Sequence, residues 1–185
     1  MHITKTVTRL TAAAALLLLA ACNNQDAKPI SSGASVNPAE VQFTTDAYQI
    51  IEFDRQEGAL AKTQARSPAV KAISDQLTSQ ANEFASRLAP IAAAASITPP
   101  RILRTDLRVR LGHMRLQQGL DFDRTYVADQ IASHEELLRM QGGVRDEGAV
   151  SPQFATLMRD GTSLVRENLE KLRALQRQVG SAPRV

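Results

Sequence analysis

The chain has 185 residues, in which 22 lysines and arginines stand against 19 acidic residues, and its formal net charge is only +3. This near balance gives no indication of nucleic-acid binding, and a single cysteine excludes an intramolecular disulfide or a thiol redox pair. The length is that of one ordinary domain with a short leader.

The N-terminal residues are typical of a secretory signal peptide. Lys5 and Arg9 precede an Ala- and Leu-rich stretch that is shorter than the roughly 20 apolar residues needed to span a bilayer. The stretch ends in LAAC at positions 19–22, which resembles the bacterial lipobox, where a diacylated cysteine becomes the new N-terminus. We therefore expect residues 1–21 to be a lipoprotein signal peptide and Cys22 to carry palmitate or a similar acyl chain.

The residues after the cysteine predict where the anchor lies and how far it reaches. Asn23, and not an aspartate, follows the lipidation position, and by the Gram-negative sorting convention this favours the periplasm-facing leaflet of the outer membrane. Residues 22–38 are rich in Asn, Ser, Gly and Pro, so we expect a flexible tether that reaches roughly 20–25 Å. Removal of Lys5 and Arg9 would leave 20 basic and 19 acidic residues, so the sequence predicts no nucleic-acid partner.

Residues 39–180 form one predicted domain with helical periodicity, followed by a short tail at 181–185. Good helix formers dominate it, and no alternation of β-branched residues predicts a strand. Asn37-Pro38, Ser67-Pro68 and Ser151-Pro152 each predict a helix start, because a capping side chain precedes a proline at the first helical position. Apolar stripes recur every three or four residues, as at Phe43, Ala47, Ile50, Asp54, Gly58 and Ala61, at Val127, Ile131, His134 and Leu138, and at Leu157, Gly161, Leu164, Asn168, Leu172 and Leu175.

The order of the predicted helices indicates an all-α antiparallel four-helix bundle. Pro90 should kink the second helix or loosen its end, and Thr98-Pro99-Pro100 should stop it. A shorter amphipathic segment follows at 101–118, and we expect it to pack as an extra short helix between the second and third long helices.

Three stretches together resemble a known family of the bacterial envelope. They are SPAVK at 67–71, GLDFDRTYV at 119–127 and SHEELL at 133–138, and the most specific element is FD-x-x-Y with a histidine eight residues after the tyrosine. After a lipobox, this combination is similar to the family called domain of unknown function 4142, over roughly residues 43–176. The resemblance implies a ferritin-like bundle and a structural or interaction role in the envelope, with stress tolerance as one candidate process.

The resemblance also implies a set of inward-facing polar positions. Members often carry histidines on the second, third and fourth helices and an acidic residue on the first. These positions fall at Ala81, His134, Asn168 and Asp54, with Glu57 one turn from Asp54. Independently, Asp54, His134 and Asn168 each lie on an apolar stripe, where a polar side chain must find a partner or cost stability. We therefore predict a buried polar cluster of these three residues.

Two interpretations of that cluster stay open. A di-iron ferritin-like site needs Glu-x-x-His pairs, and neither His113 nor His134 has a glutamate three residues before it. We favour a buried His134 that is hydrogen-bonded to Asp54 or Asn168, with no metal, no cofactor and no catalytic residue. The alternative is a metal-binding or redox bundle with a reduced site, in which the same three residues would be the ligands.

An arginine-rich stretch supplies a further hypothesis. Asp106 is the only acidic residue between positions 101 and 115, and four arginines lie close to one helical face: Arg101, Arg104, Arg108 and Arg115. They form either a solvated face paired with neighbouring carboxylates or a contact with anionic lipid headgroups or an acidic partner. The sequence thus predicts a non-catalytic envelope lipoprotein that is bound to the membrane and to an envelope protein. A metal-binding bundle and an anionic-surface binder are the alternatives.

Replacing Cys22 by serine tests the lipobox. The variant should be neither acylated nor processed, because the chain has no other thiol to accept the lipid. Incorporation of labelled palmitate and partitioning into detergent should both be lost, whereas Asn23→Ser should leave both unchanged. A Cys22→Ser protein that still fractionates as a mature outer-membrane protein would contradict the prediction.

Overall fold

A computed structural model describes residues 37–146 and 150–182, which belong to one compact unit. The elements of the described chain are helices: α1 (Pro38–Gln64), α2 (Pro68–Ala94), α3 (Thr105–Met114), α4 (Gly119–Asp146) and α5 (Pro152–Ser181). Across these described ranges, the β structure is limited to an isolated bridge between Ala65 and Gly119. The all-α prediction is confirmed, while the predicted signal peptide, Cys22 and the tether as far as residue 36 lie outside the described residues.

Three of the long helices begin at the predicted cap-and-proline pairs. The side chain of Asn37 accepts a hydrogen bond from the backbone N–H of Ala39 at 2.8 Å. The hydroxyls of Ser67 and Ser151 accept from the third residue of their helices, at 3.4 and 3.3 Å. Each cap satisfies a backbone donor that has no partner inside the helix, so these starts are set by local sequence.

Helix α2 continues through Pro90 and ends four residues later, at Ala94. Pro90 is exposed, so the backbone carbonyl that loses its intrahelical donor can bond to water. Ser96 then adopts a left-handed conformation with φ of 55°, and the N–H of Ile97 bonds to the carbonyl of Ala92 at 2.8 Å. This pattern is a Schellman motif, which terminates the helix just before the predicted stop at 98–100.

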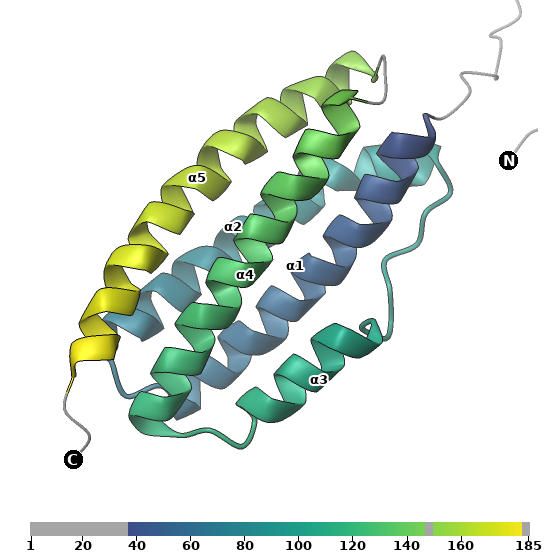
Figure 1. Cartoon of the computed structure of the whole chain (residues 1–185). Coiled ribbons are helices and arrows are strands. Elements are labelled where there is room, and N and C mark those ends of the chain that lie inside the picture. The colour runs from purple at the N-terminus through teal and green to yellow at the C-terminus, as the bar shows by residue number, and fades with distance from the viewer. Residues whose placement is uncertain (1–36, 147–149, 183–185) are drawn as a thin grey trace, which may run out of the picture. The chain divides into compact units, whose positions relative to one another are not determined.

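The four long helices pack in a closed ring in which α1 contacts α2 and α4, and α5 contacts the same two helices. Figure 1 shows that α1 and α5 run in one direction and α2 and α4 in the other. Helix α3 lies outside this ring against α1 and α4 (Figure 1). Among the described residues, no helix has an apolar stretch long enough to cross a membrane.

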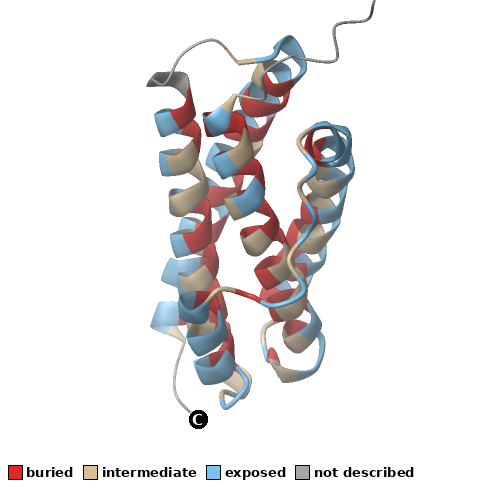
Figure 2. Cartoon of the chain, turned by 90° about the vertical axis from the view of Figure 1, so that its right-hand side faces the viewer, coloured by how far each residue is buried: buried red, intermediate tan, exposed pale blue. Residues whose placement is uncertain are grey.

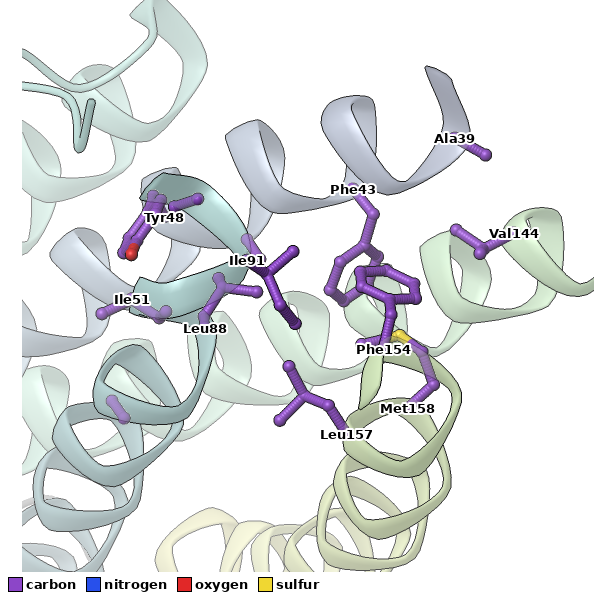
Figure 3. Packing of buried hydrophobic residues seen from close by; sticks show 13 residues of the cluster. Ala39, Phe43, Tyr48, Ile51, Leu88, Ile91, Val144, Phe154, Leu157 and Met158 are labelled. Carbon is purple, nitrogen blue, oxygen red and sulfur yellow. The ribbon is translucent and has the colours of Figure 1, made fainter. Parts of the chain in front are cut away.

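The buried residues line the inner faces of the helices and form one apolar cluster toward each end of the ring (Figure 2). Figure 3 shows the first cluster, in which Phe43 and Phe154 meet edge to face with their ring centroids 5.5 Å apart. In the second cluster, the rings of Phe122 and Tyr126 stack at 6.0 Å. The compact unit therefore contains its own core, as a domain that folds independently requires.

The residues of the predicted apolar stripes face inward, but they are not all buried to the same extent. All six stripe positions of α1 are buried, but three apolar positions predicted on the inward stripes of α4 and α5 are only half-buried: Ile131, Leu138 and Leu164. Periodicity gives the direction of a side chain but not the distance of the neighbouring helix, so the sequence could not distinguish these two degrees of burial.

The FD-x-x-Y element of the sequence has a structural explanation. Phe122 and Tyr126 are core residues one turn apart on α4. Between them, the buried carboxylate of Asp123 accepts hydrogen bonds from the backbone N–H groups of Arg66 and Ser67, at 3.1 and 2.9 Å. Asp123 therefore ties the connection between α1 and α2 to the start of α4.

Replacing Asp123 by alanine should lower the free energy of unfolding by about 2–4 kcal/mol, because two backbone donors lose a charged acceptor. Urea denaturation of residues 35–185 measures the change. Asp121→Ala, two residues earlier at an exposed position with only a 3.7 Å pair to Arg124, should change stability by no more than about 0.5 kcal/mol. Equal losses in the two variants would exclude a special role for Asp123.

Candidate functional site

A layer of buried polar side chains separates the two apolar clusters. Its members come from three helices and are each at most 7% exposed: Asp54 and Glu57 of α1, Gln130 and His134 of α4, and Asn168 of α5. The three residues predicted from the sequence are all present in it. Because buried polar groups must be hydrogen-bonded to be tolerated, the partners within this layer define what the site can do.

The side-chain amide of Gln130 lies between the two carboxyl groups. Its Nε2 donates to Asp54 Oδ1 at 3.0 Å and to Glu57 Oε2 at 2.7 Å, which uses both of its hydrogens. Burial raises the pKa of Asp54 to about 7, although the bond from Gln130 opposes the shift. Burial and the negative charges of Asp129 and Asp54 raise the pKa of Glu57 well above its ordinary value. The pair therefore favours holding a proton at neutral pH.

Arg110 of α3 closes the layer on its outer side. Its guanidinium lies 4.6 Å from the ring centroid of Phe53 and donates to the carboxylate and the backbone carbonyl of Asp129, at 3.1 and 2.7 Å. A third bond, at 3.2 Å, reaches the hydroxyl of Ser133. The positive charge of Arg110 also opposes the rise in pKa of Asp54 and Glu57.

The hydrogen bonds of His134 determine its tautomer. Its Nδ1 lies 2.9 Å from the backbone carbonyl of Gln130, and since a carbonyl oxygen only accepts, Nδ1 carries the hydrogen. Its Nε2 lies 3.3 Å from Nδ2 of Asn168, so in the neutral ring the Nε2 lone pair accepts from that amide. Burial lowers the pKa of His134, which keeps the ring neutral. The expected bond to Asn168 is thus present, while Asp54 is bonded to Gln130 instead.

Asn168 extends the network to α2. The other hydrogen of its amide is donated to Oε1 of Gln80 at 2.8 Å, and its own oxygen accepts from Nε2 of Gln76 at 3.4 Å. The amide orientation is the same in all of these bonds, so each polar atom of Asn168 has a suitable partner. Three helices are therefore joined through one side chain.

A small cavity adjoins His134 and Asn168. Its volume is about 60 Å³, and its lining is mostly apolar, with Ala81 and Phe84 on α2 and Gly161 on α5. Ala81 occupies the position at which the family resemblance places a histidine. The volume accommodates a few water molecules but falls far below the roughly 300 Å³ of a small-molecule pocket.

The donor set does not fit a transition-metal centre. Within the described residues, no group of three or more His, Cys, Asp and Glu side chains is placed to hold a metal ion. The lone pair of His134 that a metal would need accepts from Asn168, and each carboxyl accepts from Gln130 through one oxygen, while Glu57 Oε1 has no partner. The layer is held by internal hydrogen bonds, and its two carboxyl groups have raised pKa values.

The four arginines of the predicted basic face lie in different surroundings. Arg104 is half-buried and ion-paired with Glu136 of α4 and with Asp106. The other three, Arg101, Arg108 and Arg115, are exposed and take part in none of the ion pairs found among the described residues. Pairing with neighbouring carboxylates is therefore found for Arg104 and not for the other three arginines.

Two members of the site were not singled out from the sequence. Gln130 lies three residues after Val127 and four before His134, so it belongs to the same stripe. Arg110 lies three residues after Leu107 and four before Met114, which are both buried. Such spacing was the available signal, but a lone Gln or Arg on a stripe does not show which side chain it will meet.

Asp54→Asn should change how stability depends on pH. The folded protein keeps the proton of Asp54 up to about pH 7, whereas the unfolded chain loses it near pH 3.9, so this group destabilises the wild type as pH rises between these values. The variant does not titrate there, and its Oδ1 can still accept from Gln130. Its stability relative to the wild type should therefore improve by about 2–4 kcal/mol from pH 4 to pH 8.

Urea denaturation at a series of pH values measures this difference. Asp75→Asn makes the same chemical change at an exposed position of α2 and serves as the control for the loss of a surface carboxylate. A difference between Asp54→Asn and the wild type that does not change with pH would show that Asp54 does not hold a proton in the folded state.

Comparison with known proteins identifies the family of the chain. The family model described as "Domain of unknown function (DUF4142)" matches residues 25–175, which include all of α1 to α4 and most of α5. No curated protein and no solved structure shows a significant match. Because the family model covers more than half of the sequence, the chain belongs to the DUF4142 family.

Proposed function

We propose that this protein is a non-catalytic, lipid-anchored component of the bacterial envelope whose helical domain has a structural or interaction role. The lipobox ending at Cys22 and the polar stretch at 22–38 support the anchor and the tether. Asn23 supports the outer membrane as the location, with the domain facing the periplasm. An envelope protein is the proposed partner, and stress tolerance is the candidate process.

The proposed fold is a ferritin-like four-helix bundle with α3 as an extra helix. The closed ring of four long helices, with directions that alternate around it, supports this assignment. The short helix inserted between α2 and α4 supports the predicted position of the extra element.

One observation carries the proposed role: the hydrogen-bonding atoms of His134 and Asn168 are all used inside the domain. Both ring nitrogens of His134 and all polar atoms of Asn168 have partners inside the domain. A substrate or metal would have to displace these bonds, and the adjoining cavity holds only about 60 Å³. A hydrogen-bonded layer of this kind supports a function that lies on the outer surface of the domain.

His134→Leu distinguishes this proposal from a metal-binding or redox bundle. Purified residues 35–185 should contain no stoichiometric iron, manganese or zinc. The variant should fold with a stability change of about 1–2 kcal/mol, because leucine fills the space of the ring while Asn168 loses one acceptor and the carbonyl of Gln130 loses one donor. Elemental analysis and urea denaturation measure the two quantities. His113→Leu, at an exposed position of α3, is the control. A metal that is retained by the control but lost in His134→Leu would favour the metal-binding bundle over the structural role.

A further inference from the structure

The large exposed apolar side chains of the described residues all lie on one short segment. They are Ile102, Val109 and Leu116, which are 69%, 67% and 81% exposed, in α3 and its two flanks. Each directly follows one of the exposed arginines Arg101, Arg108 and Arg115. The Arg-apolar pair therefore recurs every seven residues along residues 101–116.

The three pairs lie in α3 and directly on either side of it. Arg108 and Val109 are in the helix, Arg115 and Leu116 follow its last residue, Met114, and Arg101 and Ile102 precede its N-cap, Arg104. In the same helix, Leu107 is buried in a cluster with Phe53 of α1. Residues 101–116 thus carry apolar side chains that pack on the ring and three others that are exposed.

The charge beside these exposed side chains is positive. The three arginines form no ion pair with any described residue, and Asp106, the single acid of the segment, is paired with Arg104. An interfacial helix combines these same features, since its apolar side chains enter the acyl boundary while arginines reach the anionic headgroups. Exposed apolar side chains and exposed arginines are each common on protein surfaces. Here each exposed apolar residue is the direct neighbour of an exposed arginine.

We propose that the exposed Arg-apolar pairs of residues 101–116 bind an anionic membrane surface. The inference deepens the proposed function, since a lipid at Cys22 would keep the domain within tether reach of the bilayer. Charge complementarity selects an anionic lipid, and the three exposed apolar side chains select a surface that they can enter. In this orientation, α3 lies between the four-helix ring and the bilayer surface.

Vesicle co-sedimentation of residues 35–185 tests the proposal. The protein should bind vesicles containing phosphatidylglycerol, bind pure phosphatidylcholine at least tenfold more weakly, and lose affinity as salt increases. Replacing the three exposed arginines by glutamine should weaken binding at least tenfold. Replacing Ile102, Val109 and Leu116 by serine should do the same. All six positions are exposed, and circular dichroism confirms that each variant remains folded.

A matched triple variant on α5 controls for net charge. Arg159, Arg166 and Arg177 are exposed, and their replacement by glutamine removes the same charge from a helix that does not pack on α3. Binding should stay within twofold of the wild type. An equal loss in this control, or no effect of the serine variant, would overturn the proposal. Absence of binding to anionic vesicles would also overturn it and would leave an acidic protein as the partner of this segment.

A fluorescent probe reports the contact directly. The chain contains no tryptophan, so Leu116→Trp introduces a single reporter in the proposed membrane contact. Its emission should shift to the blue when anionic vesicles are added, whereas Gln176→Trp, exposed on α5, should not respond. An unchanged spectrum for Leu116→Trp would overturn the proposal. Residues 35–185 lack Cys22, so failure of this fragment to bind vesicles says nothing about lipidation of the full chain. Likewise, failure of Cys22 to be acylated would say nothing about vesicle binding by the fragment.

Discussion

The side chain and backbone of Gln130 hold together the buried layer on which the packing of the long helices depends. The amide donates to Asp54 and Glu57, and the backbone carbonyl accepts from His134. A buried carboxyl without a donor is costly, so α1 and α4 must keep the register in which this amide lies between the two acids. Apolar stripes alone would tolerate a shift by one turn, but this set of hydrogen bonds does not.

The same constraint extends around the ring. His134 takes its orientation from the carbonyl of Gln130 and presents its lone pair to Asn168, which in turn bonds to Gln80 on α2. Each link fixes the donor or acceptor role of the next, so the network favours one arrangement of α2, α4 and α5. Both ring nitrogens of His134 and all polar atoms of Asn168 are used in bonds within the domain, which leaves Glu57 Oε1 and Gln130 Oε1 as the buried atoms of this layer without a partner.

Helix α3 connects the layer to the molecular surface. Arg110 reaches inward to Asp129 and Ser133, and with the apolar packing of Leu107 it holds the helix against α1 and α4. The exposed side chains of α3 therefore project from a helix that is held in place by these contacts. A surface that must meet a flat partner gains from this rigidity, because less conformational freedom is lost on binding.

The sequence by itself determined the helices and their inward faces. Capping side chains before Pro38, Pro68 and Pro152 set helix starts, and these depend only on neighbouring residues. The burial of Asp54, His134 and Asn168 could be predicted because helical periodicity gives the direction of a side chain. Only the tertiary structure decided that Gln130 bridges the acids, that Arg110 points inward and that Ile102, Val109 and Leu116 stay open. Each of these depends on the distance between helices far apart in sequence, and local propensity does not contain that distance.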